Sequence, residues 1–494
     1  MGSDPGLRRL VLGTLLAAYR GPQPPPWAVD LVAEGLAGHT LFGTNVHTLP
    51  QVAESTAALR AARSDVLVAI DEEGGDVTRL AHATGSPYPG NAALGVVDDV
   101  ASTRLVHESI GAELAQVGVT VNLAPTVDVN TADDNPVIGV RSFGSDPARV
   151  AAHAAAAVAG LQAAGVSACA KHFPGHGATV TDSHLQLPTV DVPVEVLRER
   201  DLPPFAAAVT AGARAVMTAH IRVPALTGEM PATFSRAVLV DLLRGEYGFT
   251  GALVTDALEM KGAAAVAGGV GPAAVRALAA GADLLCLGAR VDAALVEEVV
   301  AEIVAGLGDG RLDRTRVEEA AGRAAGLAAA TAGRPPAGST PDHHLGYAAA
   351  RRAVRVEGHL DGLDRPLVVQ VHATSTRAVG RVPWGLGPHL TDVEQTRVVV
   401  AETSAEGLRQ LAGQRPIILV GRNLHRIPGA CDLVGSLAAV HPVVVVELGW
   451  PGRWRPTGAR AFVATYGASH ANCRAAAEVL GLTRGESVSA RCVT

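Results

Sequence analysis

The stretch at residues 169–184, CAKHFPGHGATVTDSH, gathers side chains suited to acid/base chemistry directly after an apolar run. Lys171 and His172 end that run, whereas Asp182 and His184 follow further along and are two residues apart. A carboxylate paired with an imidazole fixes the tautomer of the ring and raises its basicity. Asp182 and His184 therefore either form an acid/base pair or only pack and cap a surface loop, and their spacing leaves both open.

Two other aspartates follow apolar runs. Asp256, in VTDALEM, has no basic neighbour in sequence, which is typical of a carboxylate presented into a cleft, but it can also cap the next helix. Asp71, in AIDEEGGD, precedes a Gly pair that permits a tight turn, and it can accept hydrogen bonds from sugar hydroxyls. Arg79 and Arg141 are donors that can complement it, although either one alone can also be structural.

A metal site is the weaker interpretation of the histidine-rich stretch. His172, His176, Asp182 and His184 are possible ligands, but their spacing does not match a helical HExxH pattern. The ammonium group of Lys171, beside His172, would also repel a cation. The sequence therefore disfavours a metal at this stretch.

Eight short β-rich runs, alternating with Ala-rich helical stretches, position these residues. Such alternation over this length predicts a (β/α)8 barrel, whose active site lies at the carboxyl ends of the strands. Asp71, Asp128, Lys171 with His172, His220 and Asp256 each stand at or just beyond such an end. The predicted runs are residues 10–19, 38–43, 65–71, 119–125, 166–173, 215–220, 251–257 and 281–287.

A second domain is predicted after the barrel. A Pro/Gly/Ser/Thr-rich stretch divides the chain into a barrel at residues 1–330, a linker at 331–345 and a C-terminal domain at 346–494. Strand-like runs such as PLVVQVHA, PIILVG and VVVVELG alternate with helical segments, which predicts a smaller three-layer α/β domain with a mostly parallel sheet. It lacks a GxGxxG motif after its first strand, so we propose no nucleotide site.

Composition narrows the class of protein further. The 494 residues carry a net charge of −7 with both signs interspersed, so nucleic acid is not an expected partner. The early run LVLGTLLAAY lacks a small-residue cleavage site and is interpreted as a buried strand and turn rather than a signal peptide, so neither a membrane segment nor secretion is expected. Five scattered cysteines indicate core thiols. We expect a soluble cytoplasmic protein.

The motifs together resemble glycoside hydrolase family 3, in its NagZ-type branch of β-N-acetylglucosaminidases. The resemblance rests on KHFPGHGATVTDSH, IDEEGG, NPVIGVRSFGSDP, MTAHIRVPALTGEMPATFS and GFTGALVTDALEM, and spans roughly residues 10–287. It implies a retaining mechanism in which Asp256 is the nucleophile and His184, partnered by Asp182, is the acid/base. The resemblance also implies that the non-reducing GlcNAc unit is bound by Asp71, Arg79, Arg141, Lys171 and His172, and that no metal or organic cofactor is needed.

Some positions depart from the family. Family sequences often have DQEGGR where this chain has DEEGGD, so Asp76 stands where arginine is usual. In addition, SDD before the nucleophile helix is TDA here, so Thr255 and Ala257 flank Asp256. We expect catalysis to be retained with altered polarity around the nucleophile.

The leading hypothesis is an exo-acting β-N-acetylglucosaminidase for muropeptide or chitin-derived oligosaccharides, as in peptidoglycan recycling. A phosphorylase is the first alternative, because a neutral histidine does not repel an incoming phosphate as a carboxylate would. A β-glycosidase for another or a modified sugar is the second. A non-catalytic GlcNAc-binding or sensing protein is the third, although a binder need not keep a nucleophile opposite an acid/base.

Overall fold

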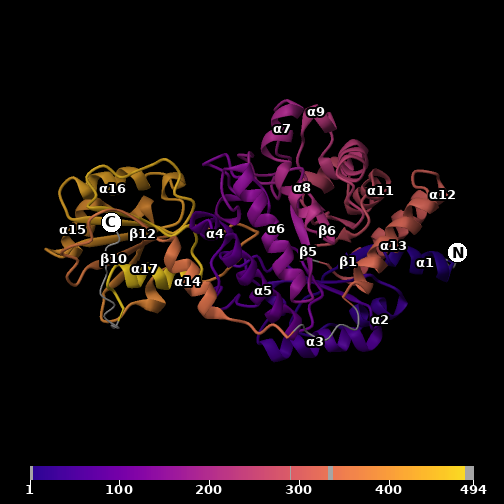
Figure 1. The fold of residues 1–494 in the computed structure, drawn as a ribbon, viewed down its shortest axis with the longest axis horizontal. Helices are drawn as coiled ribbons and strands as arrows, with labels where there is room; N and C mark the ends of the chain where they lie inside the picture. Colours follow the sequence, from indigo (N-terminus) through magenta and orange to yellow (C-terminus); the bar gives the residue numbers. More distant parts are fainter. Residues whose placement is uncertain (1–3, 290, 332–337, 484–494) are drawn as a thin grey trace.

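The protein has two α/β parts arranged along its longest axis (Figure 1). The structure is a computed structural model and describes residues 4–289, 291–331 and 338–483. The first part is the larger one and carries the strands β1 to β8, and the second carries β9 to β14.

The first part is an eight-stranded parallel barrel, as predicted. Its strands are hydrogen-bonded in the order β7-β6-β5-β4-β3-β2-β1-β8, and a parallel bridge between Val254 and Leu284 joins the two ends. The strands are β1 (Leu15–Ala17), β2 (Gly38–Leu41), β3 (Leu67–Ile70), β4 (Val121–Asn122), β5 (Ser167–Phe173), β6 (Ala215–Thr218), β7 (Ala252–Thr255) and β8 (Leu285–Cys286).

Helices surround the barrel, and many begin at residues suited to a helix N-terminus. Thr48, Asp99, Asp146, Asp292 and Asp313 each accept a backbone N–H of the first turn, which satisfies a donor that the helix leaves unpaired. The helices are α1 (Pro5–Leu12), α2 (Pro26–Glu34), α3 (Leu49–Ala62), α4 (Asn91–Val97), α5 (Val100–Gln116), α6 (Pro147–Ala163), α7 (Val194–Arg200), α8 (Pro203–Thr210), α9 (Pro224–Thr227), α10 (Lys261–Ala267), α11 (Val270–Ala280), α12 (Ala293–Gly308) and α13 (Arg314–Ala329).

The prediction of a strand at residues 10–19 was wrong in its first half. Helix α1 continues to Leu12, and β1 contains only Leu15–Ala17. Asp4 caps this helix and Pro5 occupies its first turn, while Val11 and Leu12 are buried. A short apolar run has the same composition in a buried strand and in a buried helical turn, so composition could not separate the two.

Alternate strand residues face the inside of the barrel or the helices around it. One buried cluster includes Leu67, Val121, Cys169, Met217 and Val254 from different strands. A second, larger cluster joins the outward faces of the strands to the helices. The barrel is therefore a packed core, and the site is confined to its rim.

The second part has the mostly parallel sheet that was predicted. The order is β11-β10-β12-β13-β14-β9, with β9 antiparallel to β14 and the other pairs parallel. The strands are β9 (Arg355–Gly358), β10 (Leu367–Val371), β11 (Gln395–Val398), β12 (Ile417–Gly421), β13 (Val443–Glu447) and β14 (Ala461–Ala464).

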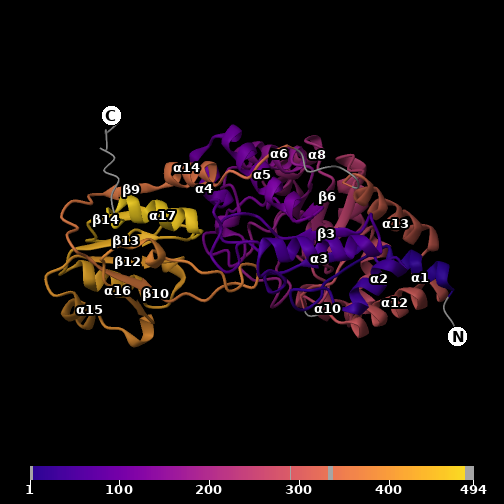
Figure 2. The same ribbon diagram turned by 90° about the horizontal axis from the view of Figure 1, so that it is seen from below.

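Helices cover both faces of this second sheet (Figure 2). Helices α15 (Ala405–Ala412) and α16 (Ala430–Ala438) bury apolar side chains on one face, and α17 (His470–Val479) does so on the other. Helix α14 (His343–Ala353) packs against α17 and against α4 and α5 of the barrel. It begins inside the predicted linker 331–345, of which residues 332–337 lie outside the described part of the chain.

No single helix among the described residues is long and apolar enough to cross a membrane. Helices α10 and α11 meet the length and hydropathy test only as a pair, and they are bent by 95° at the break between them.

Candidate active site

The predicted site residues lie around one end of the barrel. Asp71 directly follows β3, Lys171 and His172 lie near the carboxyl end of β5, and Asp256 directly follows β7. In a parallel barrel the carboxyl ends of all strands meet at one rim. The structure therefore places these groups at the same mouth, on loops and strand ends supported by the packed interior.

A buried ionic network forms the floor of this mouth. The Lys171 ammonium contacts Asp71 Oδ1 at 2.6 Å and Glu73 Oε1 at 2.7 Å, and the Arg141 guanidinium binds both oxygens of Glu73 at 2.7 and 2.9 Å. Burial alone would lower the pKa of Lys171, but Asp71 and Glu73 outweigh it and raise that pKa. Burial would likewise raise the pKa of Glu73, but Arg141 and Lys171 hold it well below its ordinary value. The floor is thus a set of fixed charges that can bind sugar hydroxyls.

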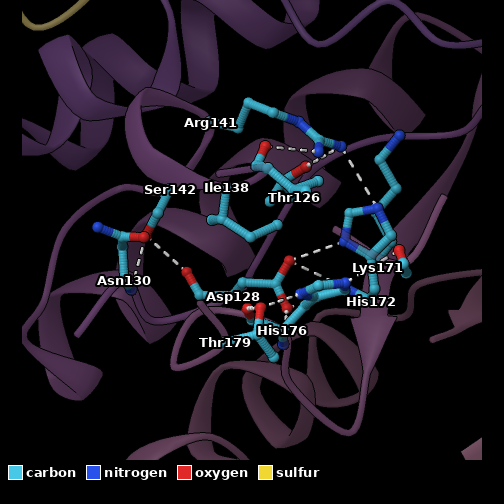
Figure 3. A network of polar contacts seen from close by, with 12 residues as sticks. Thr126, Asp128, Asn130, Ile138, Arg141, Ser142, Lys171, His172, His176 and Thr179 are labelled. Atoms are coloured by element: carbon cyan, nitrogen blue, oxygen red, sulfur yellow. Dashed lines mark hydrogen bonds and ion pairs between the residues drawn. The ribbon is translucent and has the colours of Figure 1, made fainter. Parts of the chain in front are cut away.

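Asp128 fixes the orientation of His172 (Figure 3). Its carboxylate contacts His172 Nδ1 at 2.8 Å and accepts the backbone N–H of His176 at 2.6 Å. Arg141 Nη2 lies 3.3 Å from His172 Nε2, and because a guanidinium can only donate, Nε2 accepts and Nδ1 carries the hydrogen. Burial alone would raise the pKa of Asp128, but His172 and His176 outweigh it and lower that pKa.

The loop after β3 is held in a tight turn by its glycines and by Glu72. Gly74 and Gly75 both have positive φ, at 75° and 62°, so the prediction of a tight turn at this Gly pair is confirmed. Glu72 Oε2 accepts the backbone N–H of Arg79 at 2.7 Å and that of Leu80 at 2.9 Å. Because of this turn, Arg79 lies close to Asp71 at the barrel mouth, with its Nη2 4.0 Å from Asp71 Oδ2.

Asp182 and His184 form the pair that their spacing left open. Asp182 Oδ1 lies 2.7 Å from His184 Nδ1 and also accepts the His184 backbone N–H at 2.8 Å. Burial would raise the pKa of Asp182, but its hydrogen bonds to His184 outweigh that effect and lower it. Because the carboxylate holds Nδ1, the Nε2 atom of His184 is the one that can exchange a proton. The pair lies on the irregular loop between β5 and α7, and both side chains are partly exposed.

Asp256 is kept ionised at the carboxyl end of β7. Its Oδ1 accepts the Ala257 N–H at 2.7 Å, and in the described residues Oδ2 has no hydrogen-bond donor. Burial alone would raise the pKa of Asp256, but His220, His172 and His184 outweigh it and lower that pKa. The neighbouring carbonyl of Ala257 accepts from His220 Nε2 at 3.1 Å. A charged oxygen without a competing donor is suited to nucleophilic attack.

Sequence reasoning gave no role to two groups on which this site depends. Glu73 stands in the motif AIDEEGGD and was given no role, although it joins Lys171 to Arg141. Asp128 was placed on the rim without its partners, His172 and His176. The run of three acidic residues at 71–73 could have indicated a role for Glu73. The position of Asp128 just after the fourth strand could have indicated a role for that residue. Within the described ranges, no group of three or more His, Cys, Asp and Glu side chains is arranged to hold a metal ion.

A barrel mouth with an ionised carboxylate, a His–Asp pair and a charged floor has the features of a glycoside hydrolase. Residues 27–327 match the glycosyl hydrolase family 3 N terminal domain, and the chain belongs to this family. The resemblance found in the sequence motifs is thereby confirmed.

Individual relatives agree with this membership. The chain is 36% identical over 330 residues to Beta-hexosaminidase A of Pseudoalteromonas piscicida, an alignment that covers 61% of this chain and 55% of that protein. It is 41% identical over 268 residues to a Beta-hexosaminidase of Xylella fastidiosa strain M12, covering 53% of this chain and 77% of the relative. The solved structure of a family 3 beta-N-acetylglucosaminidase from Paenibacillus sp. str. FPU-7 superposes with a TM-score of 0.86 at 32% identity, over 96% of each chain. Both parts of the fold therefore have a counterpart in one enzyme.

Proposed function

We propose that the chain is a retaining exo-β-N-acetylglucosaminidase that removes non-reducing terminal GlcNAc from muropeptide or chitin-derived oligosaccharides. The observation that carries this proposal is the 2.7 Å contact between Asp182 and His184 on a partly exposed loop, at the same barrel mouth as an ionised Asp256. The names of the relatives support an N-acetylhexosamine as the sugar.

In the first step Asp256 Oδ2 attacks the anomeric carbon while His184 acts as general acid. The C1–O bond to the leaving group breaks as the bond from C1 to Asp256 forms. His184 Nε2 gives its proton to the departing oxygen, and Asp182, on Nδ1, stabilises the imidazolium beforehand. The product of this step is a glycosyl-enzyme with a neutral imidazole.

In the second step the neutral His184 acts as general base. Its Nε2 takes a proton from water, the water oxygen attacks C1, and Asp256 leaves as a carboxylate. Two inversions at C1 give net retention, and the imidazolium is regenerated for the next cycle. Asp71, Arg79, Arg141, Lys171 and His172 hold the sugar, and their hydrogen bonds can tighten as the ring distorts.

The role of Asp256 is tested by Asp256→Asn, which keeps the shape of the side chain and removes its charge. We expect kcat/KM for p-nitrophenyl β-GlcNAc to fall by about 10⁴-fold or more, since the nucleophile acts as a unit with the acid/base. Asp292→Asn is the matched control, because Asp292 only caps α12. Unchanged turnover by Asp256→Asn would remove the basis of the proposal.

Product analysis identifies which acceptor and which sugar the protein uses. Chitobiose and a GlcNAc-anhydroMurNAc peptide are each incubated with the protein, with and without inorganic phosphate. Free GlcNAc in both conditions supports the hydrolase, whereas GlcNAc-1-phosphate formed only with phosphate supports a phosphorylase. A panel of aryl β-glycosides tests other sugars, and GlcNAc binding without turnover on any of them would indicate a sensing protein.

A further inference from the structure

Asp76 is paired across the two parts of the molecule. Its Oδ2 lies 2.5 Å from Arg422 Nη2, and its Oδ1 accepts the backbone N–H of Ala468 at 2.7 Å. The two side chains are 1% and 11% exposed, so the ion pair is largely removed from water. A charge buried at this depth is costly unless it is paired, so each partner depends on the other.

Arg422 is held firmly on its own side of the contact. It follows directly after β12, the strand between β10 and β13 in the second sheet. Its guanidinium also lies over the ring of Trp384, 5.4 Å from the centroid, an arrangement that stabilises a cation. The second sheet thus presents a fixed cation to the loop after β3.

The same loop makes a second contact with this part of the protein, at the sugar-binding Arg79. Arg79 Nη2 donates to the carbonyl of Ala378 at 2.8 Å while lying 4.0 Å from Asp71 Oδ2. Between these polar contacts, Val77 packs with Val379 and Val382 in a small buried apolar cluster. One short loop, with Asp76, Val77 and Arg79 on it, is therefore fixed at three points by the second domain.

A parallel arrangement holds the segment that bears Arg141. Trp450 Nε1 donates to Asp133 Oδ1 at 3.3 Å, and Arg426 Nη1 donates to the Asn135 carbonyl at 2.9 Å. Asn135 Oδ1 in turn accepts the backbone N–H groups of Val137 and Ile138, just before Arg141. The described contacts of the second domain at the barrel mouth thus include both loops that carry sugar-binding arginines, whereas His184 and Asp256 stand on loops after β5 and β7.

We propose that Asp76 and Arg422 are positioning residues, through which the second domain holds Arg79 beside Asp71 in the sugar site. This inference rests on the proposed function, since it assigns the pair to binding of the same terminal sugar. The pair does not touch the reacting atoms. Its loss should therefore weaken sugar binding more than it slows the chemical steps.

The test uses the full chain with Asp76→Asn, Arg422→Met, the double variant, and Arg422→Lys. For p-nitrophenyl β-GlcNAc we expect KM to rise about 10-fold in either single variant, with kcat changed less than about threefold, because uniform binding is lost. The double variant should be no worse than either single one, as expected for two residues that act through one contact. Arg422→Lys, which keeps the charge, should recover part of the loss, and inhibition by free GlcNAc should weaken in step with KM.

Arg352→Met is the matched control. Arg352, on α14, pairs with Asp99 at the start of α5. This variant therefore also breaks an ion pair with the barrel, but the pair involves neither of the two loops that carry Arg79 and Arg141. Its KM should stay at the value of the unaltered chain. An unchanged KM in Asp76→Asn and Arg422→Met, or an equal rise in Arg352→Met, would overturn the inference while leaving the proposed function intact. Absence of turnover by the unaltered chain would instead contradict the proposed function.

Discussion

Two histidine–aspartate pairs lie at the barrel mouth, and the difference between them bears on the roles proposed for them. His172 and Asp128 are 7% and 0% exposed, whereas His184 and Asp182 are 22% and 15% exposed. The contact distances are nearly equal, at 2.8 and 2.7 Å. Hydrogen-bond geometry alone would therefore give the two pairs the same role.

Their surroundings distinguish them. His172 has a partner on each ring nitrogen, Asp128 on Nδ1 and Arg141 on Nε2, so its orientation and tautomer are fixed. His184 has Asp182 on Nδ1, and among the described residues no hydrogen bond is made by its Nε2. A general acid needs one nitrogen able to reach the leaving group. The comparison supports the proposal that His184 transfers the proton and that His172 positions the sugar.

The largest contrast between the two pairs is expected when Asp182 and Asp128 are each replaced by asparagine, with turnover and stability as the quantities compared. Asp182→Asn should lower kcat by about 10²-fold or more, since an amide no longer selects the productive tautomer of His184. Its free energy of unfolding should change by less than about 1 kcal/mol, because the pair is partly exposed. The readouts are steady-state turnover of p-nitrophenyl β-GlcNAc and denaturant unfolding.

Asp128→Asn is the counterpart and should act mainly on stability. Its carboxylate accepts three N–H groups, from the His172 ring and from the backbones of His172 and His176, and an amide cannot accept all of them. We expect a loss of about 3 kcal/mol in the free energy of unfolding. If Asp182→Asn were the more destabilising variant, or Asp128→Asn left stability unchanged, the division between the pairs would fail.

A smaller effect is expected at Glu72, a buried acid that, unlike Asp128, has no histidine or other cationic partner among the described residues to keep it charged. Glu72 is equally buried, but it faces the backbone N–H groups of Arg79 and Leu80 and the Thr78 side chain, with Glu113 as a nearby acid; burial raises its pKa to about 7. An acid whose folded pKa is raised favours the folded state at low pH, and this contribution is lost as pH rises from about 4.5 through about 7.

Glu72→Gln should therefore flatten part of the pH dependence of unfolding. The decline in stability between about pH 5 and 7.5 should shrink by on the order of 1–2 kcal/mol, as measured by denaturant unfolding at a series of pH values. Glu447→Gln is the counterpart in the second domain and should flatten the profile over the same pH range, since burial also raises the pKa of Glu447 to about 7. A pH profile identical to that of the unaltered chain would show that Glu72 is ionised in the folded protein.

Local sequence patterns predicted the fold better than they predicted the contacts of the site. Periodic apolar runs located the strands because each strand buries its own side chains, and the exception at residues 10–19 was a run too short to separate strand from helix. The domain boundaries, the cytoplasmic location and the muropeptide substrate stay predictions.

The contacts that were missed join residues far apart in the chain. Glu73, after β3, binds Arg141, between β4 and α6, and Lys171, in β5; Asp76 binds Arg422, which is 346 positions away. Spacing carries information only over a turn or a strand, so it could pair Asp182 with His184 but not Asp128 with His172. Even at Asp76, where the departure from the family was visible, the partner required the folded chain.

The central claim, that His184 and not His172 transfers the proton, is tested most directly by azide rescue. His184→Ala and His172→Ala are assayed on 2,4-dinitrophenyl β-GlcNAc, whose leaving group departs without an acid, so that attack on the glycosyl-enzyme limits turnover. Azide needs no general base, so added azide should raise kcat of His184→Ala and yield the β-glycosyl azide, with no such gain for His172→Ala. Rescue of His172→Ala in its place, or of neither variant while both remain folded, would contradict the account.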